Sequence, residues 1–160
     1  MEQANFDDYD QGLHNGPAAY GIAARHAAEH MRQAGAGSII HIGSMYGLVT
    51  GYPEVYEGLT SPNSIVYQAG KAAIIHMTHY MAVYWARDRI RVNCITPGAF
   101  PNKSAQEKMP ELMRRLEAKT PMARIGQPWE LKGAAVFLAS QASSYMTGQN
   151  LIVDGGWTLW

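Results

Sequence analysis

Gly37-Ser38-Ile39-Ile40-His41-Ile42-Gly43-Ser44 is the stretch of sequence that decides the fold. Residues 38–42 show no alternation of polar and apolar side chains. That pattern predicts a short strand buried on both faces, as the strands of a parallel sheet are. The pair Gly43-Ser44 ends the strand, so the chain is expected to leave the sheet at Ser44.

The segments around this strand alternate between helix and strand. Apolar side chains at helical spacing precede and follow it, and further short apolar runs lie toward the carboxyl terminus. Strands separated by helices are typical of an α/β domain with a parallel sheet. The other predicted elements are helices over 6–34, 64–86, 104–118 and 128–139, and strands over 90–95 and 151–153.

The two long helices each have an unusual feature. Pro17 has no N–H to offer the carbonyl of Leu13, so a kink or break is expected near Asn15. The helix over 64–86 is apolar around most of its circumference, which is more than a single core-facing stripe requires. It therefore lies at the centre of its domain or against a partner subunit, and 6–34 and 64–86 are expected to form a homo-oligomer contact.

Composition excludes several classes of protein. The 160 residues hold 13 Lys and Arg against 13 Asp and Glu, and this net charge of zero argues against a nucleic-acid partner. A hydrophobic fraction of 47% is too high for a disordered chain. The single cysteine, Cys94, rules out an internal disulfide, and no apolar stretch reaches the roughly 18 residues of a membrane span. We expect a cytoplasmic globular protein of one domain with no membrane partner.

Tyr67 and Lys71 are the strongest candidates for catalytic residues. They lie four residues apart near the start of a predicted helix and so share one face. A nearby ammonium favours the phenolate form of a tyrosine, which can then exchange a proton near neutral pH. Taken alone, this spacing is equally that of an incidental surface pair, so the surrounding residues decide between the two.

Three further positions supply that context. Ser44 ends a buried strand, where a doubly wound sheet places its ligand. Asn15 lies at the predicted helix break, where its side chain and a released backbone carbonyl can hold a water. Pro97-Gly98 ends another strand on the same edge of the sheet.

These residues belong to a longer ordered pattern. Asn15, the stretch 37–44, Tyr67-Gln68-Ala69-Gly70-Lys71, residues 90–98 and residues 147–156 occur in this order. Together they resemble the carboxyl-terminal part of a classical short-chain dehydrogenase/reductase, over essentially the whole chain. The resemblance implies a partial doubly wound, Rossmann-like parallel sheet of about three strands with flanking helices. It also implies an oxidoreductase that uses NAD or NADP to interconvert an alcohol and a carbonyl of a small molecule.

The resemblance implies a role for each matching residue. Tyr67 would be the general acid/base, and Lys71 would lower its pKa and bind the nicotinamide ribose. Ser44 would orient the reacting oxygen, and Asn15 would hold a water in a proton relay with Lys71. The catalytic set is thus Asn15, Ser44, Tyr67 and Lys71, and the cofactor-binding set is Asn15, Tyr67, Lys71, Pro97, Gly98, Ala99 and Phe100, with no metal.

One departure from the family is an insertion. Ser44 and Tyr67 are 23 positions apart, more than the family usually shows, and the surplus is a Gly- and Tyr-rich loop over 45–63. Tyr46, Tyr52 and Tyr56 in this loop are candidates for the substrate pocket. Family members with a comparable insertion include enzymes of sugars and sugar acids, so a sugar-like substrate is one hypothesis. The other is that the segment is a floppy surface loop.

A second departure concerns the cofactor. The family's Gly-rich turn, its residue that selects NAD or NADP and its Asn-Asn-Ala-Gly strand end have no counterpart here. Residues 1–160 are therefore expected to form an incomplete domain, the catalytic half without the amino-terminal dinucleotide-binding half. The strand over 38–42 would then be an exposed edge. Two functions remain open: a truncated oxidoreductase, or a non-catalytic, oligomer-forming remnant that cannot bind a dinucleotide tightly.

Several other residues are interpreted as structural. The pairs His26 with His30 and His76 with His79 have spacings that can bind metal, but no cysteine or carboxylate cluster joins them, which favours surface or interface positions. Cys94 is expected to be a small buried side chain. Helix 104–118 is expected to be charged and exposed, with Arg114-Arg115 on a solvated face, and Trp157 and Trp160 are expected to pack on a neighbouring subunit.

Overall fold

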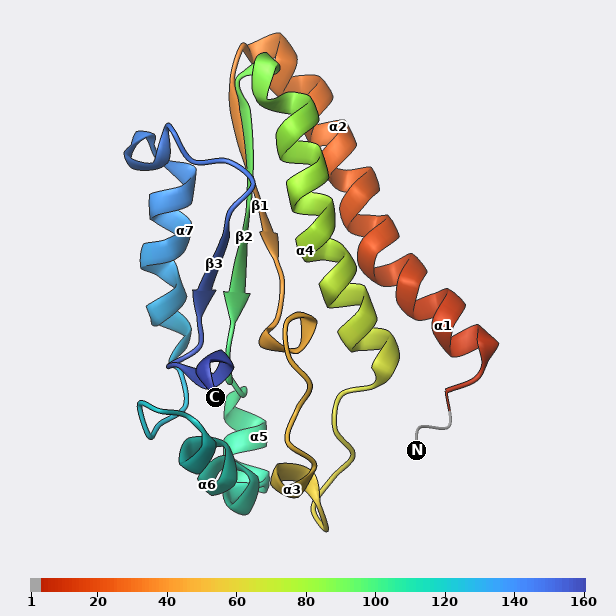
Figure 1. The fold of residues 1–160 in the computed structure, drawn as a ribbon, viewed down its shortest axis with the longest axis vertical. Coiled ribbons are helices and arrows are strands. Elements are labelled where there is room, and N and C mark those ends of the chain that lie inside the picture. Colours follow the sequence, from red (N-terminus) through yellow and green to blue (C-terminus); the bar gives the residue numbers. More distant parts are fainter. Residues whose placement is uncertain (1–3) are drawn as a thin grey trace.

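The fold is a three-layer arrangement around one parallel sheet (Figure 1). The computed structural model describes residues 4–160, and residues 1–3 of the predicted domain lie outside the described part. Within residues 4–160 the strands β1 (Gly37–Ile42), β2 (Ile90–Pro97) and β3 (Asn150–Val153) form a parallel sheet in the order β1-β2-β3. Helices α2 (Ala19–Ala34) and α4 (Ile65–Trp85) cover one face, and α7 (Lys132–Ala139) covers the other. The predicted α/β class and all three strands are confirmed.

β1 is an edge strand, as expected, because it pairs with β2 alone in the described sheet. The expectation that it is buried on both faces is wrong. Ile39 and His41 are buried under α2 and α4, but Ile40 is only half-buried and Ile42 is 41% exposed. Ser38 and Ile42 lie on the face turned toward α7, where the Ser38 hydroxyl donates to the Leu138 carbonyl, and this face has the thinner cover.

The helix predicted over 6–34 is not broken at Pro17. It consists of α1 (Phe6–Leu13), a π-turn (His14–Ala18) and α2, which follow one another without interruption. The wider turn of a π-helix accommodates a residue that cannot donate a hydrogen bond, so the chain keeps its direction while Pro17 becomes buried.

The helix predicted over 104–118 is two helices, α5 (Lys103–Lys108) and α6 (Pro110–Lys119). Pro110 begins α6, and Met109 before it takes a non-helical backbone (φ −132°, ψ 57°), because proline disfavours the helical conformation of the preceding residue. α6 is not an exposed helix, since it buries Leu112, Met113 and Leu116. The loop over 45–63 also contains structure: a 3-10 turn (Met45–Gly47) and the short helix α3 (Pro53–Tyr56).

Within residues 4–160, two apolar clusters form the core. One lies between the sheet and the helices α2 and α4, and the other lies beyond the carboxyl ends of the strands, where α3, α5 and α6 gather (Figure 1). Trp157 belongs to the second cluster and is 1% exposed within its own chain, so the expectation that it packs on a neighbour is wrong. Trp160 is 66% exposed, and its neighbour contact stays a prediction.

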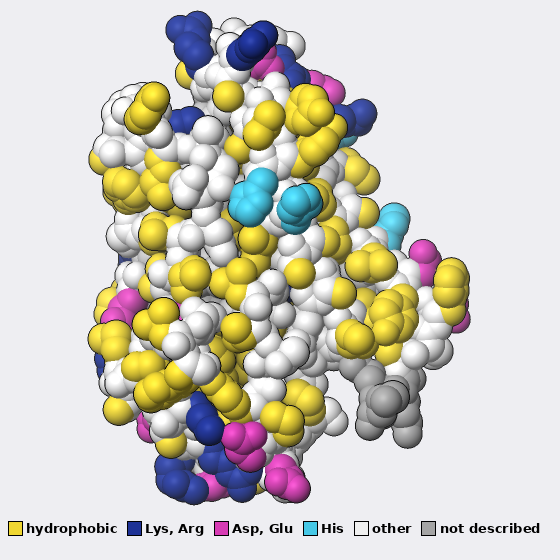
Figure 2. All heavy atoms as spheres, viewed as in Figure 1, with side chains coloured by type: hydrophobic (Ala, Val, Ile, Leu, Met, Phe, Trp, Pro, Cys, Tyr) yellow, Lys and Arg dark blue, Asp and Glu magenta, His cyan; other side chains and the backbone are white. Residues whose placement is uncertain are grey.

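α4 is both central and partly uncovered. Its inner side buries Ile74, Ile75 and Met81 among other residues, while Tyr80, Val83 and Tyr84 are mostly exposed on its outer side. Figure 2 shows hydrophobic side chains spread over this face of the molecule, with charged side chains gathered toward its two ends. Within residues 4–160 no helix has the length and apolar character that crossing a membrane requires.

A buried histidine lies between β1 and α4. The His41 Nδ1 is 2.9 Å from the Thr78 hydroxyl oxygen, which itself donates to the Ile74 carbonyl. When the single hydrogen of that hydroxyl is donated to Ile74, Nδ1 is the donor to Thr78 and Nε2 is the unprotonated nitrogen. Nε2 is buried and has no hydrogen-bond partner among the described residues. Burial lowers the pKa of His41, so the folded protein holds it neutral.

This histidine makes stability depend on pH. Its folded pKa lies below the unfolded value of 6.5, so the unfolded chain binds more protons as the pH falls below about 6.5. We expect the free energy of unfolding to be largest above this pH and to decline toward about pH 5, and His41→Asn to flatten that decline. Urea denaturation at several pH values measures it. His76→Asn, at an exposed histidine of α4, is the control and should keep the wild-type slope; equal slopes for all three proteins would contradict the prediction.

Candidate active site

A cleft of about 1270 Å³ lies between the α1–α2 helix and the start of α4. Asn15, Tyr20, Tyr67 and Lys71 line it, together with the loop residues 61–64. Three of the four predicted catalytic residues therefore face one cavity. A volume of this size is sufficient for a cofactor and a small substrate.

Tyr67 is placed by the first turn of α4. Ser64 caps the helix, and its hydroxyl accepts a hydrogen bond from the Tyr67 N–H at 3.1 Å. Tyr67 is 40% exposed and lines the cleft.

Lys71 lies one turn further along α4 and is held in a fixed position. Its Nζ donates to the carbonyl of Ile42 at 2.9 Å, which ties α4 to the end of β1. The same Nζ lies 5.7 Å from the centre of the Tyr67 ring and 5.6 Å from the centre of the Tyr20 ring, within range of a cation–π attraction. Burial lowers the pKa of Lys71. The ammonium is thus partly desolvated beside the tyrosine that it would activate.

Asn15 lies within the π-turn and lines the same cleft. π-turns occur often at functional sites, because they release backbone groups from the regular helical pattern. The structure agrees with the predicted irregularity at Asn15, although it is a π-turn rather than a break.

Ser44 follows the end of β1 and is buried, at 8% exposed. Its hydroxyl accepts a hydrogen bond from the Tyr46 N–H at 3.2 Å and so caps the 45–47 turn. This turn packs closely on α4: a side chain at Gly47 would lie 2.8 Å from the backbone of Lys71 and Ala72. Ser44 is therefore held on the side of the sheet from which Lys71 reaches Ile42.

Pro97, Gly98, Ala99 and Phe100 lie at the carboxyl end of β2. Gly98 donates to the Val153 carbonyl at 2.9 Å, and a Cβ at this position would lie 2.5 Å from the Cα of Asp154, so only glycine fits. Ala99 and Phe100 line a second cavity of about 90 Å³, which is also lined by the ion-paired Arg124 and Glu130. These four residues share the strand-end edge with the Tyr67 cleft but are not among the residues that line it.

The three tyrosines of the 45–63 loop belong to the apolar core and do not line the cleft. Tyr46 is 5% exposed, its hydroxyl meets that of Tyr56, and burial raises the pKa of both phenols. Tyr52 donates to the Trp160 carbonyl at 2.6 Å and packs on Trp157. None of the three is among the residues that line the cleft, so a direct contact of Tyr46 or Tyr52 with substrate stays a prediction.

Sequence reasoning missed Tyr20 as a residue of the cleft. In a regular helix, residues five apart lie roughly 140° apart around the axis. The wider π-turn reduces this angle, so that Tyr20 and Asn15 line the same cleft. Whether Tyr20 shares the cleft with Asn15 thus depends on whether the helix is regular or contains a π-turn at this point. The presence of Pro17 alone does not determine which of the two forms.

No cluster of three metal-ligating side chains occurs in the described part of the chain.

Comparison with known proteins fixes the family. A family model described as enoyl-(acyl carrier protein) reductase matches residues 7–158. The chain belongs to the short-chain dehydrogenase/reductase family. This short-chain dehydrogenase/reductase chain is 38% identical to galactitol 2-dehydrogenase (L-tagatose-forming) of Cereibacter sphaeroides over 140 residues, 86% of this chain and 52% of that protein.

Solved structures agree with this membership. A short-chain dehydrogenase of Leptospira borgpetersenii with bound NAD+ matches with a TM-score of 0.85 and 36% identity, over 99% of this chain and 59% of that one. A gluconate 5-dehydrogenase of Burkholderia cenocepacia in complex with NADP and tartrate matches with a TM-score of 0.84 and 33% identity, again over 99% and 59%. The short-chain dehydrogenase/reductase chain thus spans about half the length of the curated relative and somewhat more of the solved ones.

Proposed function

We propose that this chain carries the proton-transfer site of an NAD(P)-dependent oxidoreductase that interconverts an alcohol and a carbonyl. One observation carries the proposal: the Lys71 ammonium is fixed by the Ile42 carbonyl and lies between the rings of Tyr67 and Tyr20 in an open cleft. A cation held beside a solvent-accessible phenol is the arrangement that a tyrosine general acid/base needs.

Each residue has a distinct task in this proposal. The Tyr67 hydroxyl takes the proton from the alcohol in oxidation and returns it to the carbonyl oxygen in reduction. The Lys71 ammonium stabilises the phenolate that forms in between. The Ser44 hydroxyl orients the reacting oxygen, and Asn15 holds a water through which Lys71 exchanges protons with solvent.

The donor groups of the cleft fit the ribose side of a nicotinamide cofactor. Lys71 uses one of its three N–H hydrogens on Ile42, and the others can bind ribose hydroxyls beside Tyr67 and Asn15. Pro97, Gly98, Ala99 and Phe100 would lie along the nicotinamide. When bound, NAD or NADP supplies or accepts the hydride, and the protein supplies position and the proton.

A sugar-like substrate is the proposed class. The matched relatives are named as dehydrogenases of galactitol and of gluconate, and one of them was solved with tartrate. All three of these compounds carry hydroxyl groups on adjacent carbons. We propose a polyol or a sugar acid as the substrate of this chain as well.

Titration with NADH and NADPH, followed by fluorescence, tests the proposal directly. We expect micromolar binding that Lys71→Ala weakens at least about tenfold, because the lysine supplies charge-assisted hydrogen bonds to the cofactor. Lys132→Ala, at an exposed lysine of α7, is the matched control and should bind as the wild type does. Absence of binding at millimolar cofactor would favour the alternative, a non-catalytic oligomer-forming remnant.

We also propose that the chain forms a homo-oligomer through the helices over 6–34 and 64–86. Ile22 of α2 and Tyr80, Val83 and Tyr84 of α4 are exposed apolar or aromatic side chains on these helices. A monomer in light scattering at micromolar concentration would contradict this.

A further inference from the structure

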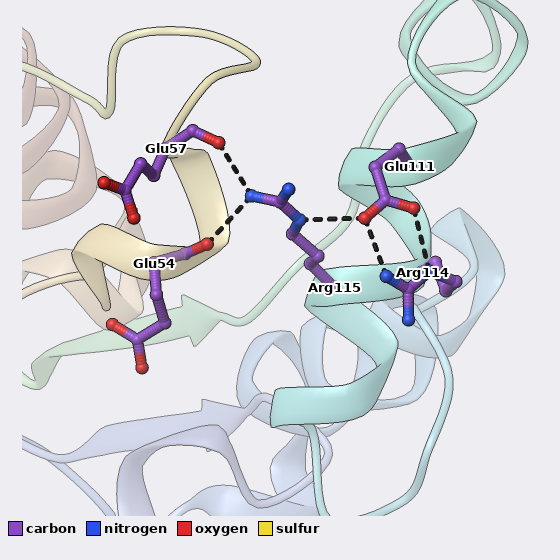
Figure 3. A network of polar contacts seen from close by, with 5 residues as sticks. All are labelled: Glu54, Glu57, Glu111, Arg114 and Arg115. Atoms are coloured by element: carbon purple, nitrogen blue, oxygen red, sulfur yellow. Dashed lines mark hydrogen bonds and ion pairs between the residues drawn. The ribbon is translucent and has the colours of Figure 1, made fainter.

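Arg115 joins two segments that are far apart in the sequence. Its Nη1 donates to the carbonyls of Glu54 and Glu57, at 2.9 and 2.8 Å, and its Nε donates to the Glu111 carboxylate at 2.9 Å (Figure 3). The two carbonyls lie in and just after α3, where a helix leaves its last acceptors without partners. The side chain is 29% exposed, so Arg115 is not the solvated residue that the sequence predicted.

Neighbouring Arg114 provides a contrast within the same helix. It donates to both oxygens of Glu111, at 2.8 and 2.7 Å, and its side chain is 71% exposed. The two arginines together lower the pKa of Glu111 to about 2, so this carboxylate stays charged and keeps the Arg115 guanidinium oriented. Figure 3 shows that Arg115 points toward α3, whereas Arg114 points away from it.

Lys119, one turn further along α6, makes a second connection to the same loop. Its Nζ is 2.9 Å from the Glu54 carboxylate and 4.5 Å from the centre of the Tyr52 ring. Both contacts reach residues of the loop over 45–63. Arg115 and Lys119 on α6 thus connect this helix to α3 and to Tyr52, the residue before α3.

An apolar cluster lies beneath these polar contacts. The loop contributes Val55 and Tyr56 to it, α6 contributes Leu112 and Leu116, and Trp157 completes it from the carboxyl terminus. All five side chains are buried. The part of the loop around α3 is therefore packed on the domain, which argues against the interpretation of 45–63 as a floppy surface loop.

Both ends of this loop carry residues of the candidate active site. Ser44 precedes it, and Ser64 follows it as the cap that accepts from the Tyr67 N–H. Residues 61–64 also line the cleft. α3 lies within the segment that joins these two ends, so the contacts that hold α3 also restrict residues 61–64 in the wall of the cleft.

We infer that Arg115 is a positioning residue that fastens the 45–63 loop to α6 and thereby sets the substrate side of the cleft. The inference rests on the proposed function, because it assigns the loop wall to the polyol or sugar acid. The carboxyl-terminal end of the loop, residues 61–64, then acts as a rigid wall that α6 holds from outside the cleft. Its position determines how a substrate with several hydroxyl groups lies against Ser44 and Tyr67.

Substitution of the two adjacent arginines tests the inference. Arg115→Met keeps the apolar stem and removes the three donated hydrogen bonds, whereas Arg114→Met removes only contacts to Glu111. We expect Arg115→Met to raise KM for a polyol such as galactitol about tenfold while kcat changes less than about twofold, and Arg114→Met to leave both near wild type. Arg115→Lys should recover part of the KM, since a lysine can reach one carbonyl but lacks the planar fork.

Two further measurements separate the possible failures. Hydrogen exchange of the amides over 45–63 should be faster in Arg115→Met than in Arg114→Met, with or without turnover. The affinity for NADH should be equal in both variants. Equal exchange would overturn the fastening role, and an unchanged KM with faster exchange would overturn the substrate role. A wild type that shows no turnover would overturn the proposed function and the substrate role, and the exchange comparison would still decide whether Arg115 fastens the loop.

Discussion

Tyr67→Phe is expected to lower kcat for alcohol oxidation by about 10³-fold, within the range that a general acid/base contributes. The substitution removes one oxygen and keeps the ring, which lies 5.7 Å from the Lys71 Nζ. The contact of Lys71 with the Ile42 carbonyl does not involve Tyr67 and should persist. Binding of NADH should therefore stay within a few fold of the wild type, so that the loss appears in kcat. Steady-state kinetics with a polyol and fluorescence titration together measure the two effects.

A second tyrosine of α4 serves as the control. Tyr80 is 60% exposed and stacks on Tyr84, away from the residues that line the cleft. Tyr80→Phe removes the same atom from the same helix and should leave kcat unchanged. If Tyr67→Phe retained more than about a tenth of the wild-type turnover, the acid/base role of Tyr67 would have to be abandoned.

Local sequence patterns predicted the parts of the site that lie on single elements. The apolar run at 38–42 specified β1, and Ser44 follows directly from where that strand ends. Tyr67 and Lys71 share a face because four residues make about one helical turn, and both line the same cleft in the structure. For such residues the backbone period already determines which side chains meet.

The sequence could not predict contacts that depend on how distant elements pack. In the sequence, Arg115 is one of several charged residues in a polar helix. It donates to the carbonyls of Glu54 and Glu57 only because α3 lies beside α6 in the fold. The burial of His41 likewise depends on α2 and α4 lying over β1, since Tyr20 packs edge-on against its ring and the Thr78 hydroxyl forms a hydrogen bond with its Nδ1. These are long-range contacts, and helix or strand periodicity carries no information about them.

Trp157 is the clearest case of a residue that only the structure places, and it leads to the largest expected effect on stability. Its side chain is 1% exposed and packs against the rings of Tyr46 and Tyr52, with ring centres 6.5 and 5.5 Å away. Trp157→Ala would leave a cavity in the cluster that joins the loop, α6 and the carboxyl terminus. We expect it to lower the free energy of unfolding by about 3–5 kcal/mol, measured by urea denaturation.

Two matched substitutions show whether that loss comes from packing. The Trp157 Nε1 is buried and has no acceptor among the described residues, so Trp157→Phe removes no hydrogen bond and should cost only about 1 kcal/mol. Trp129→Ala, at a tryptophan that is 63% exposed, should change stability by less than about 0.5 kcal/mol. A Trp157→Ala variant as stable as Trp129→Ala would mean that the cluster does not hold the loop.

Because Trp157→Phe should keep its fold, its KM for a polyol can be compared with that of Arg115→Met. A KM near wild type in Trp157→Phe, together with a raised KM in Arg115→Met, would show which contacts position the wall of the cleft. They would be the hydrogen bonds of Arg115 and not the apolar cluster beneath them.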